Sequence, residues 1–79
     1  MQIRVLFFGA TADETNTRVM DFAVASPADV RGTLEELLVR FPQLGNHKIR
    51  FAVNQQYVSA DRLLNDGDEL AVFTAVSGG

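Results

Sequence analysis

Hydrophobic and polar residues alternate at four places along the chain, which is the pattern of strands in a half-buried sheet. The alternating stretches are residues 2–8, 17–25, 48–53 and 69–76. Gly9 ends the first stretch, and Asp66-Gly67-Asp68 is a turn signal before the last. Asn54-Gln55-Gln56 predicts a tight reversal into a further short strand at Tyr57-Val58. The pattern therefore predicts five strands.

The segment between the second and third strands has a helical period instead. Ser26 is predicted as the N-cap and Pro27 as the first helical residue, because both are favoured at those positions. Pro42 predicts that the helix ends near Phe41. The apolar stripe of this helix consists of Val30, Leu34, Leu37, Leu38 and Phe41. Residues 10–16 are predicted to form a loop with room for one helical turn.

The predicted order of elements is ββαβββ, which leaves one amphipathic helix to cover one face of a single mixed sheet. That arrangement is the α+β β-grasp, or ubiquitin-like, fold, with the first and last strands adjacent in the middle of the sheet. A chain of 79 residues has room for one such domain. We expect residues 1–74 to form it and residues 75–79 to leave it as a flexible C-terminal tail.

The alternation also separates two faces of the sheet, if polar strand residues point to solvent. The side chains predicted to face the helix are Ile3, Val5, Phe7, Met20, Phe22, Val24, Ile49, Phe51, Val53, Leu70 and Val72. The uncovered face receives Leu6, Phe8, Ala52, Ala71 and Phe73. A contiguous exposed apolar patch on a small domain marks a partner surface. The alternative is that bulky residues on an open sheet only shield one another.

Composition narrows the range of partners and compartments. The chain has 7 basic and 10 acidic side chains and a net charge of −3, which disfavours nucleic acid and suits a partner with a basic docking surface. It has no cysteine, which excludes disulfides, thiolate metal sites and a cysteine nucleophile. No apolar stretch approaches the length of a membrane span, and no signal peptide is evident. We expect a cytoplasmic protein without a membrane partner.

Residues that could perform catalysis are scarce. His47 is the sole histidine, and it lies beside a Gly-Asn turn without a carboxylate partner at motif spacing, so it is predicted to be a solvated turn residue. Asp66, Asp68 and Glu69 supply too few ligands for an EF-hand and are predicted to be turn and strand-entry residues. Ser77 has no accompanying base. The chain itself is therefore expected to bind no metal or cofactor.

The two glycines at the end of the chain have a specific chemical use. Gly78 and Gly79 carry no Cβ, so the terminal carboxylate is unhindered and the chain there can enter a narrow channel. Five extended residues from Ala75 to Gly79 reach about 17 Å at ~3.3–3.6 Å per residue. The tail could therefore serve as a substrate arm in a partner's active site. A frayed terminus is the alternative.

Motifs at both ends of the chain resemble those of a known family. They are Val5-Leu6-Phe7-Phe8, Ala52-Val53-Asn54-Gln55, Val58-Ser59, Asp61, Leu64, Asp66-Gly67-Asp68-Glu69 and Val76-Ser77-Gly78-Gly79. Together they resemble the small, sulfur-carrying subunit of molybdopterin synthase, a ubiquitin-like β-grasp sulfur carrier. The family often has Pro-Pro where this chain has Thr74-Ala75, and it commonly has Arg-Glu where this chain has Asp13-Glu14.

The resemblance implies a two-stage cycle centred on Gly79. An E1-like adenylyltransferase would use ATP and Mg²⁺ to adenylate the Gly79 carboxylate, and a sulfur donor would convert it to a thiocarboxylate. Two small subunits would flank a dimer of large subunits, which deliver the sulfur to cyclic pyranopterin monophosphate in molybdenum cofactor biosynthesis. The residues implied for the large-subunit channel are Ala75, Val76, Ser77 and Gly78, and those for the partner interface are Leu6, Phe8, Tyr57 and Phe73.

Two other functions remain open from the sequence. A carrier of the same kind could serve thiamine or another sulfur pathway, because those carriers also pair a Gly-Asp turn with a terminal Gly-Gly. A ubiquitin-like tag would instead be joined through its Gly79 carboxyl to lysines of target proteins. Both alternatives need the same activated carboxyl group.

Overall fold

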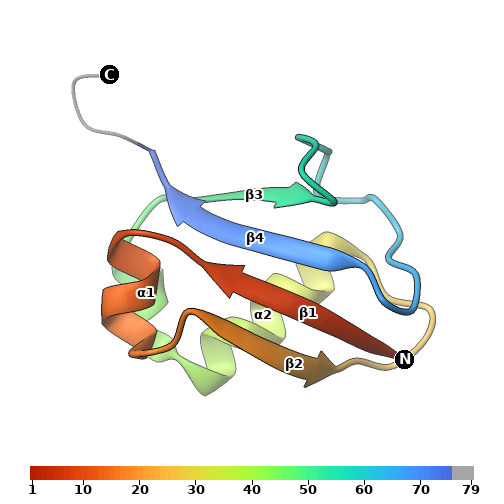
Figure 1. Cartoon of the computed structure of the whole chain (residues 1–79), viewed down its shortest axis with the longest axis horizontal. Coiled ribbons are helices and arrows are strands. Elements are labelled where there is room, and N and C mark those ends of the chain that lie inside the picture. Colours follow the sequence, from red (N-terminus) through yellow and green to blue (C-terminus); the bar gives the residue numbers. More distant parts are fainter. Residues whose placement is uncertain (76–79) are drawn as a thin grey trace.

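The computed structural model describes residues 1–75 and contains one mixed sheet with one face covered by a helix (Figure 1). The elements are β1 (Gln2–Phe7), α1 (Ala10–Thr15), β2 (Val19–Ala23), α2 (Val30–Arg40), the 3₁₀ helix η1 (Pro42–Asn46), β3 (Ile49–Val53) and β4 (Glu69–Thr74). The described strands form a four-stranded sheet in the order β2-β1-β4-β3. β1 and β4 are parallel, and the two outer strands are antiparallel to them. The predicted β-grasp fold is confirmed.

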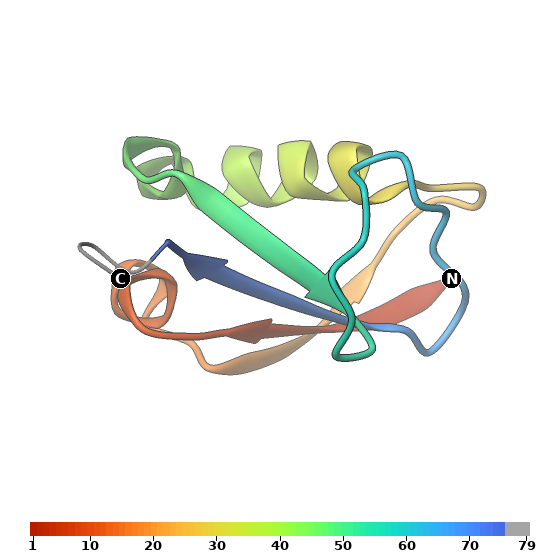
Figure 2. The same cartoon turned by 90° about the horizontal axis from the view of Figure 1, so that it is seen from above.

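The helix α2 lies across one face of the sheet and leaves the other face open, while α1 lies at one end of the sheet (Figure 2). Val5 sits opposite Met20 on β2 and Leu70 on β4, so one row of apolar side chains crosses three strands toward α2. The buried hydrophobic residues are Ile3, Val5, Phe7, Val24, Val30, Leu37, Leu44, Ala52, Val53, Leu64, Leu70 and Val72. The predicted core residues Met20, Phe22, Ile49 and Phe51 are partly buried against them.

The helix α2 begins three residues later than the sequence predicts. Its N-cap is Asp29, whose carboxylate accepts a hydrogen bond of 2.8 Å from the Gly32 N–H. The predicted Ser26 cap is wrong because the chain just before α2 is tied to the loop before β4: the Val30 N–H donates to the Arg62 carbonyl at 3.1 Å. The cap also explains Gly32, since a Cβ there would lie only 3.1 Å from Asp29 Oδ1.

The reversal after β3 is present, but the short strand predicted after it is not. Asn54 and Gln55 adopt positive φ values of 49° and 68°, and Val53 and Gln56 exchange backbone hydrogen bonds across the turn. Tyr57-Val58 then leaves the sheet, so the predicted fifth strand is wrong. The prediction of a turn at residues 66–68 is correct. Asp68 is buried there, and its carboxylate accepts hydrogen bonds from Asn54 Nδ2 and the Asn65 N–H.

The short helix α1 is fixed to the central strand β4 by the buried hydroxyl of Thr11. Its Oγ1 lies 2.8 Å from the carbonyls of Phe8 and Val72 and accepts from the Phe8 N–H at 3.0 Å. We expect Thr11→Val to lower the free energy of unfolding by about 1–3 kcal/mol, because it leaves buried polar groups without a partner. Urea denaturation measures this. Thr11→Ser keeps the hydroxyl and is the control; equal stability of the two variants would contradict the assignment.

Candidate functional site

The strand that leads to the C-terminal tail is a central one. β4 is paired on both sides, with β1 and with β3, and its last residue Thr74 lies opposite Ile49. Ala75, the first predicted tail residue, follows directly and is exposed. The other predicted tail residues, Val76, Ser77, Gly78 and Gly79, lie outside the described residues. The sheet therefore holds the base of the tail in a fixed position.

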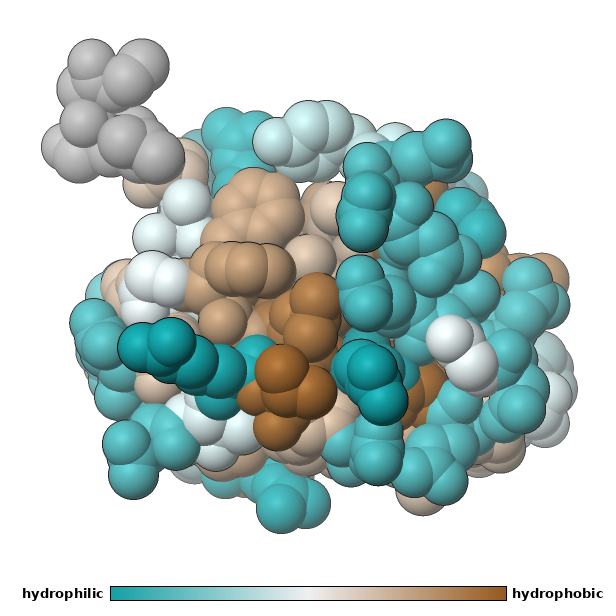
Figure 3. Space-filling view, viewed as in Figure 1, coloured by the Kyte–Doolittle hydropathy of each residue, from teal (hydrophilic) through white to brown (hydrophobic). Residues whose placement is uncertain are grey.

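The open face of the sheet carries an apolar patch beside this exit (Figure 3). Leu6 is flanked by Ala71 on β4 and by Val19 on β2, and Phe73 follows two residues after Ala71 on the same face. Phe8 is 51% exposed and Val19 54%. We call this set the open-face patch; its members are Leu6, Phe8, Val19, Tyr57, Ala71 and Phe73.

Tyr57 joins the patch from the loop after β3. Its ring contacts Phe73 edge-to-face, with 6.2 Å between the ring centroids and 64° between the planes, and Tyr57 remains 82% exposed. The structure thus brings together Leu6, Phe8, Tyr57 and Phe73, the four residues predicted for the partner interface. Ala52 lies on the open face as predicted, opposite Ala71, but its side chain is buried there and adds no exposed surface to the patch.

Val19 is a patch residue that the sequence prediction left out. It precedes Met20, which faces the helix, so the alternation already placed Val19 on the opposite face. The register that places Val19 directly opposite Leu6 could not be predicted from the alternation. With Val19 included, the patch extends from the central strands to β2, at the edge of the described sheet.

The prediction that His47 is a solvated turn residue without a carboxylate partner is wrong. His47 Nε2 lies 3.0 Å from Glu14 Oε1, and Gln43 Nε2 donates to the Glu14 carbonyl at 2.6 Å. The pairing joins α1 to η1 across 33 residues of sequence, a distance that no local motif reveals. These contacts hold α1 against the segment that follows α2. Among residues 1–75, no three potential ligand side chains gather into a metal-binding group.

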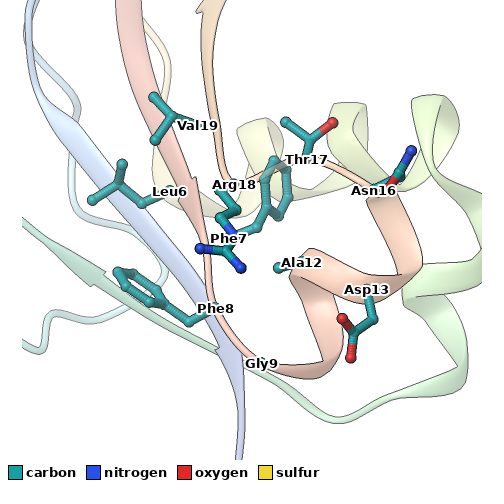
Figure 4. A pocket seen from close by; sticks show the side chains of 10 residues that line it. All are labelled: Leu6, Phe7, Phe8, Gly9, Ala12, Asp13, Asn16, Thr17, Arg18 and Val19. Atoms are coloured by element: carbon teal, nitrogen blue, oxygen red, sulfur yellow. The ribbon is translucent and has the colours of Figure 1, made fainter.

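Beside the open-face patch lies a hollow of about 770 Å³, formed where β1 passes into α1 and α1 into β2 (Figure 4). Its lining residues are Leu6, Phe7, Phe8, Gly9, Ala12, Asp13, Asn16, Thr17, Arg18 and Val19. Gly9 has a φ of 58°, which glycine adopts readily and which turns the chain from β1 into α1. The hollow shares Leu6, Phe8 and Val19 with the patch, so the two form one continuous surface.

One carboxyl group with a perturbed pKa lies elsewhere on the molecule. The Ser59 hydroxyl donates to the Asp61 carboxylate and lowers the pKa of Asp61. Both residues belong to the loop between β3 and β4, which contacts the start of α2 through the bond from the Arg31 N–H to the Ala60 carbonyl. The lowered pKa of Asp61 therefore reflects a contact within this loop and not a reactive group of the open face.

None of the helices described within residues 1–75 has the length and apolar character needed to span a membrane.

Comparison with known proteins gives a consistent set of relatives. A model of the ThiS family matches residues 5–79. The molybdopterin synthase sulfur carrier subunit of Mycobacterium tuberculosis is 33% identical over 84 residues, with 100% of this chain and 99% of the relative covered. The subunit of the same name from Homo sapiens is 36% identical over 83 residues, covering 99% and 94% of the two chains.

Solved structures share the fold. A Pyrococcus furiosus protein assigned as subunit 1 of molybdopterin converting factor superposes with a TM-score of 0.89 at 26% identity, covering 95% of this chain and 98% of that one. SAMP1 from Haloferax volcanii superposes with a TM-score of 0.86 at 25% identity over the whole of both chains. A chain from the complex of subunits 1 and 2 of molybdopterin-converting factor from Helicobacter pylori matches in fold, with a TM-score of 0.71, 22% identity and full coverage of both chains.

Proposed function

The chain belongs to the ThiS family, and from this premise we propose that it is the sulfur carrier subunit of a molybdopterin synthase. The observation that carries the proposal is the similarity to sulfur carrier subunits of that enzyme along essentially the full length of both chains. The terminal Gly-Gly after a central strand supports it, because a carrier needs an unhindered carboxyl group on a fixed base. Its place of action is the cytoplasm.

The proposed chemistry takes place on the Gly79 carboxyl group. A carboxylate is a poor electrophile at neutral pH, so its oxygen must first become part of a leaving group. An E1-like adenylyltransferase joins the carboxylate to the α-phosphate of ATP, with Mg²⁺ on that enzyme, and pyrophosphate leaves. A sulfur donor at the oxidation level of sulfide then attacks the acyl carbon and AMP departs. The product is a thiocarboxylate, and the carrier supplies only the acyl group.

The proposed partner for sulfur delivery is the large subunit of the synthase. The Helicobacter pylori structure is a complex of subunits 1 and 2 of molybdopterin-converting factor, which supports a pairwise assembly of this kind. On this chain the open-face patch adjoins the exit of β4, so one surface could dock the partner while Ala75 directs the tail into it. We propose two carriers flanking a dimer of large subunits, with cyclic pyranopterin monophosphate as the sulfur acceptor.

A ubiquitin-like modifier is the second candidate function, favoured by the superposition on SAMP1, the small archaeal modifier protein 1 of Haloferax volcanii. Its chemistry departs from that of a carrier only after adenylation. A lysine amine of a target protein, instead of sulfur, would take the acyl group of Gly79. A carrier for thiamine or another sulfur pathway would form the thiocarboxylate and differ in the acceptor.

Mass spectrometry separates these candidates. The purified chain is incubated with its activating enzyme, ATP and a sulfide source, and then mixed with the large subunit and the pyranopterin substrate. A molybdopterin synthase carrier should gain the mass of one sulfur-for-oxygen exchange, located on the C-terminal peptide, and lose it as molybdopterin forms. Loading without molybdopterin formation would indicate another sulfur pathway. Chains linked to target lysines in cells, without loading, would indicate a modifier and contradict the proposal.

A further inference from the structure

The hollow beside the open-face patch is lined by polar and apolar groups in about equal measure, with one charged group on each of two sides. Figure 4 shows the Arg18 guanidinium over the side formed by Phe7 and Phe8, and the Asp13 carboxylate on the far wall, on α1. Within residues 1–75 the ion pairs are Arg4 with Asp21 and His47 with Glu14, so Arg18 and Asp13 make none there. A partner that covers the patch therefore meets an unpaired guanidinium, with an unpaired carboxylate on the other side of the hollow.

The opposite end of the open face has the reverse charge. Arg4 lines one shallow depression there together with Asp21, Asp66 and Glu69, so the depression has three carboxylates and one guanidinium. Arg4 pairs with Asp21 at 3.9 Å and is the cross-strand partner of Glu69. At the end nearer the tail, Arg50 is the cross-strand partner of Phe73 and is exposed. The net charge of −3 is thus unevenly distributed, with arginines bordering the patch near the tail.

We propose that the hollow receives an apolar side chain of the large subunit, and that a carboxylate next to this side chain pairs with Arg18. The inference rests on the proposed function, because the hollow extends the surface on which the large subunit would dock. An apolar group fits against the apolar lining residues Leu6, Phe8 and Val19, and a carboxylate fits the only cation among the residues that line the hollow. The expectation of a basic docking surface, drawn from net charge alone, is thereby reversed at this end of the patch.

The pairing would orient the docked partner. Complementary charge fixes the register of an interface and speeds association more than it adds raw affinity. A partner carrying carboxylates over Arg18 and cations over the Arg4 end is attracted in one orientation and repelled in the other. The attracted orientation places its acidic side at the end of the sheet where β4 ends and the tail begins.

The test is binding of the purified chain to the large subunit of molybdopterin synthase from the same organism, at low and at high salt. We expect Arg18→Glu to raise the Kd by about tenfold or more at ~0.05 M salt. Arg18→Gln should raise it by less, because only the glutamate also repels the partner's carboxylate. The effect should shrink toward 1 M salt, where the Debye length falls to about 3 Å. Arg31→Glu on α2 makes the same charge change away from the open face and should leave the Kd unchanged.

Two results would overturn the inference. One is unchanged binding by Arg18→Glu at low salt. The other is weaker binding by Asp13→Asn, since loss of the opposing carboxylate should leave affinity equal or better if the occupant is acidic. In both cases the unaltered chain still binds, so only the inference fails. If the unaltered chain does not bind the large subunit, the proposed function fails and the inference fails with it.

Discussion

Deletion of Gly79 is expected to abolish sulfur loading and transfer completely while leaving the fold intact. The β4 ladder ends at Thr74 and the last residue of the described core is Val72, whereas the proposed chemistry takes place on the Gly79 carboxyl group. We expect the free energy of unfolding to change by no more than about 0.5 kcal/mol, as for surface changes in general. Urea denaturation and intact mass after incubation with the activating enzyme measure the two effects.

The matched control is Ser77→Ala, which alters the tail but keeps both glycines. It should be loaded with sulfur at close to the normal rate, because no role in the chemistry falls to its hydroxyl. A large loss of stability on deletion of Gly79 would mean that the tail is a structural element. Continued sulfur transfer by the deleted chain would mean that the reactive group lies elsewhere.

Replacement of Phe73 by alanine should weaken binding to the large subunit far more than it weakens folding. Phe73 lies on the open face, at the tail end of the central strand, with the exposed ring of Tyr57 against it. Aromatic residues that dominate the binding energy of an interface commonly contribute about 2 kcal/mol or more, or roughly 30-fold in Kd. The ring is only half-buried in the isolated chain, so we expect a loss of about 1 kcal/mol in the free energy of unfolding.

Titration calorimetry with the large subunit measures the Kd, and urea denaturation measures the free energy of unfolding. Val39→Ala is the matched control, since Val39 is an apolar side chain 82% exposed on α2, the helix that covers the opposite face. Its affinity should be unchanged. Unaltered affinity of Phe73→Ala would refute the assignment of the open-face patch as the docking surface. A partner that receives the tail and docks on this patch would cover Phe73, which lies at the tail end of the patch.

The parts of the fold that depend on local alternation were predictable from the sequence. Residues such as Val5 and Leu70 could be placed in the core because a period of two assigns each to one face. The start of α2 was not predictable in this way. Ser26-Pro27 is a good local start signal, yet contacts with the distant Arg62 and Leu63 hold Asp29 in an extended conformation, so the helix begins only after it. Long-range hydrogen bonds thus outweighed the local preference.

Some features of the candidate site could likewise be predicted from the sequence, and others depend on long-range contacts. The use of Gly78 and Gly79 could be inferred from residue identity, because the chemistry needs only an unhindered carboxyl group. The contact of Tyr57 with Phe73 and the pair of His47 with Glu14 each join segments that are distant in sequence. No spacing rule relates such residues, so only the folded chain reveals them.

The most direct test uses a chain whose Gly79 carboxyl group is capped as an amide. It is compared with the free acid in a reconstituted system of activating enzyme, ATP, sulfide source, large subunit and pyranopterin substrate. The amide should fold and bind the large subunit normally but form no molybdopterin, because it cannot be adenylated. Molybdopterin formation by the amide at the rate of the free acid would contradict the central claim that this carboxyl group carries the sulfur.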